Sequence, residues 1–170
     1  LTVYFVSVAF FQLVYGPLSD RFGRKPPLLC GLGILALGGL LGSIAESFEI
    51  LILARVFQGM GAASIYSIVR AIINDSYGRE EGASALSTIT GIMMVAPIFS
   101  LVSGGVITEL IGWKGGMFLI LLAGLIPLSL NSILLPETNI QQIQRINFNI
   151  LIKNHVSILV NPLFLSFDDG

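Results

Sequence analysis

Residues 16–29 read GPLSDRFGRKPPLL and separate two runs of almost wholly apolar sequence. This stretch places Asp20, Arg21, Arg24 and Lys25 within six positions of a chain that is only 11% charged. Its glycines and first proline permit a tight turn, and the two later prolines suit the first turn of a helix, where a missing N–H does no harm. The stretch therefore predicts a short polar loop between two helices, in which Asp20 and Arg24 are close enough to pair.

The composition indicates a membrane protein. The chain has 170 residues, of which 54% are hydrophobic, and a mean hydropathy of +0.88. Soluble domains are about 45–50% apolar even when glycine is counted, and about 25% charged. A soluble protein of this size could not bury so much apolar surface, so lipid is the expected solvent. The net charge of −1 argues against a nucleic-acid partner, because phosphate binding needs a basic excess.

Residues that could support catalysis or metal binding are few. Cys30 is the only cysteine and His155 the only histidine, so neither an internal disulfide nor a cysteine metal centre is expected. No nucleophile–base set is present, and we therefore expect no enzyme and no metal. The chain opens at Leu1 in apolar sequence without a basic n-region, which favours an internal fragment of a longer protein over a signal peptide.

Five segments are apolar enough to cross a membrane, which takes about 20 residues for a hydrocarbon core of about 30 Å. The predicted fold class is thus all-α, a polytopic membrane helix bundle with short polar breaks such as NDSYGREEG at 74–82. Beyond them, 136–161 reads as a central loop with an interfacial helix, and 162–170 as the start of a truncated next helix. The predicted spans are 1–17, 28–45, 50–73, 85–108 and 115–135.

Basic residues fall mainly on one side of this predicted bundle, and cytoplasmic loops carry such an excess. Lys114 lies in a loop on the opposite side, together with Glu46, Glu49 and Glu109. The loop that contains Asp20 is therefore expected to be cytoplasmic. The basic residues assigned to that side are Arg21, Arg24, Lys25, Arg70, Arg79, Arg145 and Lys153.

The spans differ in polarity. Those at 28–45 and 115–135 carry few polar side chains, so we expect them to screen the others from lipid. The span at 50–73 carries Arg55, Gln58 and Tyr66, and arginine toward a helix centre costs about 2.5–3.5 kcal/mol on insertion scales. Arg55 either extends to the outer interface or faces the bundle interior beside Gln58.

The span at 85–108 contains two points at which the helix can bend. Pro97 removes a backbone donor, and Gly104 and Gly105 follow two turns later. Such interruptions suit helices that rock against one another, although kinked helices are common in membrane proteins of every kind.

Two stretches resemble motifs of the major facilitator superfamily. Residues 16–25 resemble its cytoplasmic signature G-x-L-[AS]-D-R-x-G-R-[KR], and 53–63, LARVFQGMGAA, resemble its fourth-helix motif with the core R-x-x-Q-G-x-G-A-A. QLVYGPLSD at 12–20 and LPET at 135–138 look more narrowly like the Bcr/CflA-type multidrug efflux transporters. By this resemblance the five spans are helices two to six of a 12-helix fold, which makes the chain a partial N-terminal half.

The resemblance implies roles for individual residues. Asp20 would contact the positive N-terminal end of a helix in the other half, and Arg24 and Asp75 would join it in a charge network that holds the inner gate. Arg55 would face the central cavity and take part in proton coupling, accompanied by Gln58 and Tyr66. The remaining signature residues of the gate are Gly16, Arg21, Gly23 and Lys25.

The antiporter motif of the following helix is only partly matched. The subgroup pattern is A-P-x-x-x-P-x-x-G-G, and Pro97, Gly104 and Gly105 agree with it, whereas Leu101 stands in place of the second proline. The implied function is proton-coupled efflux of drugs or small amphipathic compounds. The implied protein is a monomer in a bacterial inner membrane that contacts substrate, protons and lipids and uses the proton gradient without a cofactor. A uniporter or symporter of a metabolite or sugar, and a truncated fragment without transport activity, are the alternatives.

Overall fold

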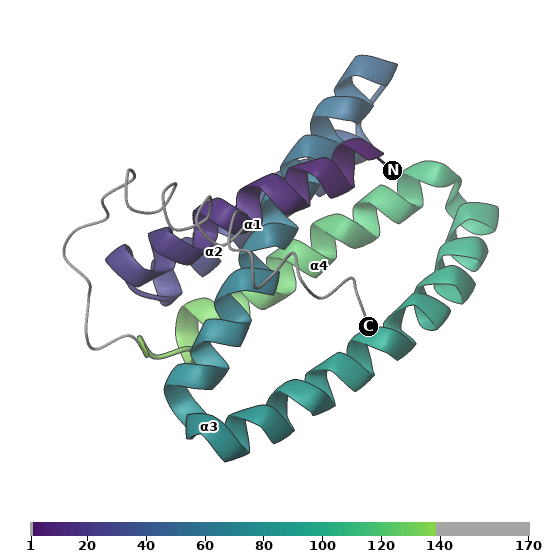
Figure 1. Ribbon diagram of the computed structural model, residues 1–170. Helices are drawn as coiled ribbons and strands as arrows, with labels where there is room; N and C mark the ends of the chain where they lie inside the picture. The colour runs from purple at the N-terminus through teal and green to yellow at the C-terminus, as the bar shows by residue number, and fades with distance from the viewer. Residues whose placement is uncertain (1, 139–170) are drawn as a thin grey trace, which may run out of the picture.

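The computed structural model describes residues 2–138, and this part of the chain is all-α, without a strand (Figure 1). Its four helices contain five segments long and apolar enough to cross a membrane, because the third helix contributes two. The structure is thus a partial membrane helix bundle. The helices are α1 (Thr2–Phe22), α2 (Lys25–Ser43), α3 (Phe48–Ile111) and α4 (Trp113–Leu134). The predicted central loop and next helix, 136–161 and 162–170, lie outside the described residues except for 136–138.

The loop predicted between the first two helices is shorter than expected. Helix α1 continues past Pro17 to Phe22, and α2 begins at Lys25, so only Gly23 and Arg24 connect them. Gly23 has a φ of +89°, a left-handed conformation that glycine adopts without a steric penalty. Asp20 therefore lies in the last turn of a helix rather than in a loop.

The polar stretch predicted at 74–82 separates two apolar segments, but it does not interrupt the helix. Helix α3 is continuous through it, and its two apolar segments are Phe48–Tyr77 and Glu81–Ile111. The stretch NDSYGREEG contains no proline, so every residue keeps its backbone donor, and its glycines lower helix propensity without forbidding helix. Figure 1 shows that α3 bends in this region, so that its two segments diverge.

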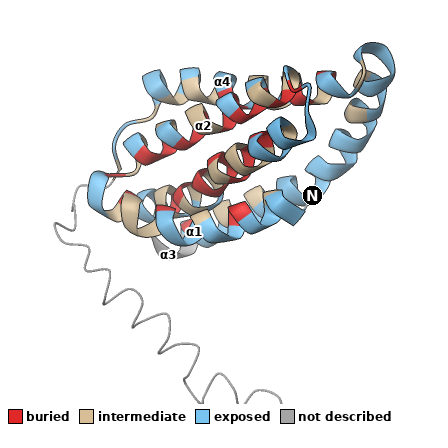
Figure 2. Ribbon diagram, turned by 90° about the horizontal axis from the view of Figure 1, so that it is seen from above, coloured by how far each residue is buried: buried red, intermediate tan, exposed pale blue. Residues whose placement is uncertain are grey.

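Helix α2 lies between α3 and α4, which corrects the expectation that the span at 28–45 faces lipid. Half of its most apolar stretch is buried, the largest share among the five segments, and buried residues line it in Figure 2. Glycine explains this position, because small residues let helix backbones approach closely. A Cβ added to Gly61 of α3 would lie 2.5 Å from the backbone N of Leu35, and one added to Gly124 of α4 would lie 2.6 Å from that of Ala36.

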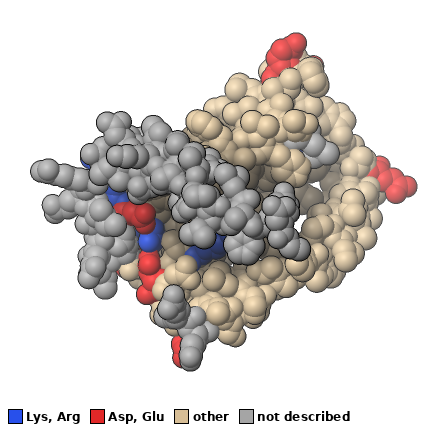
Figure 3. Space-filling model, in the orientation of Figure 1, with Lys and Arg blue, Asp and Glu red and all other residues tan. Residues whose placement is uncertain are grey.

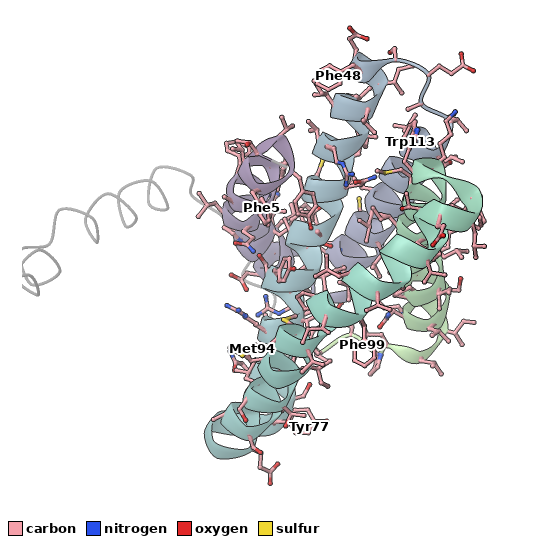
Figure 4. The ribbon with its side chains drawn as sticks, turned by 90° about the vertical axis from the view of Figure 1, so that its right-hand side faces the viewer. Phe5, Phe48, Tyr77, Met94, Phe99 and Trp113 are labelled. Atoms are coloured by element: carbon pink, nitrogen blue, oxygen red, sulfur yellow. The ribbon has the colours of Figure 1, made fainter. Side chains whose placement is uncertain are left out.

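The second segment of α3 is separate from this packed centre. No residue in the most apolar stretch of Glu81–Ile111 is buried, and the segment appears as exposed in Figure 2. Figure 4 shows the side chains of Met94 and Phe99 along this segment, Tyr77 at one end of the bundle, and Phe48 and Trp113 at the other. Aromatic residues at both ends are typical of membrane-spanning helices, which place them at the two interfaces.

Candidate functional site

Arg24 connects the end of α1 and the start of α2 to the middle of α3. Its Nη1 donates to Oδ1 of Asp20 in α1 at 2.6 Å, and its Nε donates to Oδ2 of Asp75 in α3 at 2.8 Å. The Arg24 side chain is only 11% exposed, whereas those of Asp20 and Asp75 are 44% and 29% exposed. Two charge-assisted hydrogen bonds to a largely buried guanidinium are stronger than neutral ones. The structure thus brings together the three residues that the resemblance assigns to one network.

A serine that the sequence did not single out completes the contacts of this guanidinium. Arg24 Nη1 also donates to Oγ of Ser19 at 2.8 Å, and the Ser19 hydroxyl donates to the carbonyl of Gly16 at 2.8 Å. Ser19 is almost fully buried, so its hydroxyl needs both partners. Burial lowers the pKa of Arg24, but its hydrogen bonds and charge interactions with Asp75 and Asp20 outweigh burial and raise that pKa overall.

A third acid approaches the same residue from the chain after α4. Oε1 of Glu137 accepts from the backbone N–H of Arg24 at 2.7 Å, and Oε2 accepts from that of Lys25 at 3.1 Å. The Lys25 ammonium donates to the carbonyl of Ser132 in the last turn of α4 at 2.9 Å. The sequence assigned no role to Glu137, although the LPET string contained it. In Figure 3, acidic and basic groups lie next to one another on this side of the molecule.

Two other residues of the signature, Arg21 and Gly16, make fewer contacts than Arg24 and Asp20. Arg21 is exposed, and its guanidinium lies 5.1 Å from the centre of the Phe22 ring. A Cβ added to Gly16 would meet no atom within 4 Å, so packing does not require glycine there.

In the described part of the chain, no cluster of three or more histidine, cysteine, aspartate or glutamate side chains could hold a metal ion.

Arg55 and Gln58 form a second polar site inside the bundle. Arg55 Nη1 donates to Oε1 of Gln58 at 2.9 Å, and Nε2 of Gln58 donates to the carbonyl of Gly38 in α2 at 3.0 Å. The same Nε2 lies 3.7 Å from Sδ of Met117 in α4. Gln58 is 1% exposed, so its amide links three helices from a buried position. The contact fits the interpretation in which Arg55 faces the bundle interior.

Tyr66 lies farther along the same helix and is partly exposed. Helix α1 packs closely on α3 near Arg55, since a Cβ added to Gly59 would lie 2.6 Å from the carbonyl oxygen of Tyr4. The sequence suggested Tyr66, but Tyr4 carries no motif and becomes visible only through the packing of these helices.

Pro97, Gly104 and Gly105 all lie in the exposed second segment of α3. The helix remains continuous through Pro97, and a Cβ added to either glycine would meet no atom within 4 Å. Next to Pro97 the surface has an open apolar hollow of about 630 Å³, lined by Thr88, Gly91, Ile92, Val95, Ala96 and Phe99. None of these residues contributes to the hydrogen bonds around Arg24 or Arg55 that the structure shows.

Comparison with known proteins identifies the family of this chain. The profile of the Major Facilitator Superfamily matches residues 1–165. A bicyclomycin resistance protein homolog of Haemophilus influenzae is 32% identical over 139 residues, which cover 82% of this chain and 35% of that protein. The multidrug resistance protein MdtM of Escherichia coli O157:H7 is 27% identical over 165 residues, or 97% of this chain and 40% of the relative. The multidrug resistance protein MdtL of E. coli K12 is 29% identical over 137 residues, which are 81% of this chain and 35% of that protein.

Proposed function

This chain belongs to the major facilitator superfamily, and from that premise we propose that it is part of a proton-coupled exporter of drugs or other small amphipathic compounds. The chain spans 35–40% of the length of the relatives it matches, so the activity is proposed for the full-length protein. The names of those relatives support the substrate class: one is a bicyclomycin resistance homolog and others are multidrug resistance proteins.

The observation that carries the proposal is the attachment of one arginine to two helices. Arg24 binds Asp20 at the end of α1 and Asp75 in α3, and it stands itself at the start of α2. This cluster fixes the Asp20 carboxylate at one end of the bundle. A carboxylate held there can bind the positive N-terminal end of a helix from the other half of the protein and release it when the halves rotate. We infer that this contact closes the inner gate.

Arg55 is the proposed element of proton coupling. Its guanidinium is bonded to a neutral amide, and within residues 2–138 it forms no ion pair with a carboxylate. An uncompensated cation in a membrane span is costly, and it favours the ionised form of a nearby acid. Protonation of such an acid on another helix would remove the attraction, and substrate movement could thereby be coupled to proton movement.

The proposed arrangement in the membrane follows from charge. The end with Asp20, Arg21, Arg24 and Lys25 would face the cytoplasm of a bacterial cell, because positive residues are retained on that side. The protein would act as a monomer in the inner membrane, contacting lipid, substrate and protons, with the proton gradient as the energy source and no cofactor.

Transport by the full-length protein in proteoliposomes tests the function directly. With an acidic lumen and substrate outside, an exporter inserted inside-out should take up drug and release lumenal protons, and a pH dye in the lumen reports them. Empty liposomes and liposomes with Arg55→Ala protein serve as controls. Drug accumulation without any proton movement would refute the coupling. The absence of both drug uptake and proton release would refute the proposal of an exporter.

A second candidate function is uniport or symport of a metabolite. Leu101 favours it, because this residue stands where the antiporter pattern of the subgroup has proline. The same proteoliposomes distinguish the two: a symporter moves substrate and protons in one direction, and a uniporter moves substrate without a proton gradient.

A further inference from the structure

The first turn of α2 has an unusual set of backbone donors. The first N–H groups of a helix have no partner within it, and they need other acceptors. Two prolines in this turn remove two of these donors, and the N–H of Leu28 bonds to the carbonyl of Arg24 at 3.4 Å. The N–H groups of Arg24 and Lys25 remain, and the two carboxylate oxygens of Glu137 accept one each. Both of these backbone donors therefore have an acceptor.

Gly23 provides the space for this carboxylate. A Cβ at position 23 would lie 2.5 Å from Oε2 and 2.7 Å from Cδ of Glu137, distances that real Cβ atoms essentially never show. Its φ of +89° is also strained for any residue with a side chain. The glycine of the signature thus permits the turn and leaves room for the Glu137 carboxylate, which a Cβ would push away from this position.

Arg24 is consequently held at both ends. Its backbone is bound by Glu137, from the chain after α4, and its guanidinium by Asp20 and Asp75. Lys25 adds a second link to α4 through the carbonyl of Ser132. We propose that Glu137 is a positioning residue of the gate: its carboxylate caps α2 and thereby holds the Arg24 side chain between its two aspartates. This role rests on the proposed transport function, because it acts on the same gate.

The capping contact is measured by hydrogen exchange on the full-length protein. Glu137→Ala should speed exchange about five-fold at the amides of Arg24 and Lys25, which is the factor that a typical helix cap supplies. The exchange rates of these amides in Glu137→Gln should lie between those of wild type and Glu137→Ala. The glutamine amide keeps one acceptor oxygen but has a donor in place of the second. Exchange in the middle of α2 should stay unchanged. Unchanged exchange at Arg24 and Lys25 in Glu137→Ala overturns the cap.

The positioning role needs a second measurement, in which the matched control is Glu46→Ala. Glu46 is an exposed acid beyond the opposite end of α2, so its removal changes net charge equally without touching the cluster. Glu137→Ala should lower the maximal transport rate about five-fold with an unchanged KM, and Glu46→Ala should alter neither. An unchanged maximal rate, or a loss equal to that of Glu46→Ala, overturns the role at the gate.

A double-mutant cycle shows whether Glu137 acts through Arg24. In the Asp75→Asn background, Glu137→Ala should reduce transport and thermal stability less than it does in wild type. The reason is that the Arg24 guanidinium has already lost its full interaction with Asp75. Strictly additive losses in transport and in thermal stability overturn the coupling. Hydrogen exchange and thermal stability need no turnover, so an inactive wild-type protein would refute the proposed function while the cap was still tested.

Discussion

The Nε of Arg24 donates a 2.8 Å hydrogen bond to Oδ2 of Asp75, although the two residues are 51 positions apart in the sequence. This bond ties the start of α2 to α3, close to the bend of that helix. Replacement of Asp75 by asparagine keeps the shape but removes the charge. We expect about a ten-fold lower transport rate, because a hydrogen bond to a charged group contributes about 1.5–3 kcal/mol and this pair is partly exposed. Rates that match wild type in proteoliposomes would contradict this prediction.

Asp20→Asn tests the other anchor of Arg24. Asp20 is more exposed than Asp75, so its removal should change stability little and transport strongly if its carboxylate binds the opposite half of the protein. Membrane insertion and the melting temperature of the purified variant are the controls. Normal transport by this variant would show that the Asp20 carboxylate has no role in transport.

Arg24→Lys keeps the positive charge but loses the geometry. A lysine ammonium is a single point charge, whereas Arg24 uses Nε for Asp75 and Nη1 for Asp20. We expect this variant to lose most of the transport activity. Equal activity of the two proteins, measured as initial rates of drug uptake, would show that charge alone is sufficient.

The pKa of Arg24 also predicts how the wild-type cluster responds to alkali. Its pKa is raised above the ordinary arginine value, so the stabilisation from its charge is present below the unfolded-state pKa and is lost only as pH rises through the higher folded-state pKa. Deprotonation of Arg24 therefore should not loosen the cluster between pH 6 and 9. Accelerated exchange of the Arg24 and Lys25 amides beyond the intrinsic pH effect would contradict this.

Two glycines of α2 provide a matched test of its packing. A Cβ at Gly39 would overlap the backbone of Leu121 in α4, whereas a Cβ at Gly33 would meet no atom within 4 Å. Gly39→Ala should therefore destabilise the bundle, and Gly33→Ala should be neutral or stabilise it by up to about 1 kcal/mol through helix propensity. Thermal unfolding in detergent measures both, and equal melting temperatures would refute the close packing of α2 and α4.

Gln58→Leu tests the buried amide that supports Arg55. The substitution leaves the guanidinium and the carbonyl of Gly38 without the partner they have in this structure. Because a hydrogen bond to a charged group contributes about 1.5–3 kcal/mol, loss of the Arg55–Gln58 bond should lower the melting temperature clearly. Gln58→Glu, which keeps an acceptor for Arg55, should recover part of the loss. An unaffected melting temperature in Gln58→Leu would indicate that water replaces the amide.

The membrane class and the charged residues that meet at Arg24 could be predicted from the sequence, because both depend on local signals. Apolar runs of sufficient length indicate spans wherever they pack, and the signature around Asp20 and Arg24 is contiguous. The polar composition of 74–82 predicts a loop where α3 only bends. The helix continues there because polar composition alone does not break a helix in a stretch without proline. The central position of α2 was missed for a related reason: an apolar helix rich in glycine suits a lipid-facing place and a tightly packed one equally well.

The sequence by itself determined that the chain is a bundle of membrane helices with a charged turn after the first, since hydropathy and turn chemistry act over a few residues. Only the tertiary structure decided that Glu137 caps α2 and that Gln58 joins Arg55 to α2 and α4. The contacts between different helices or segments join residues 20 to more than 100 positions apart. They form only when packing brings two backbones together, and glycine at Gly23 and Gly38 leaves room for the side chains that bridge them.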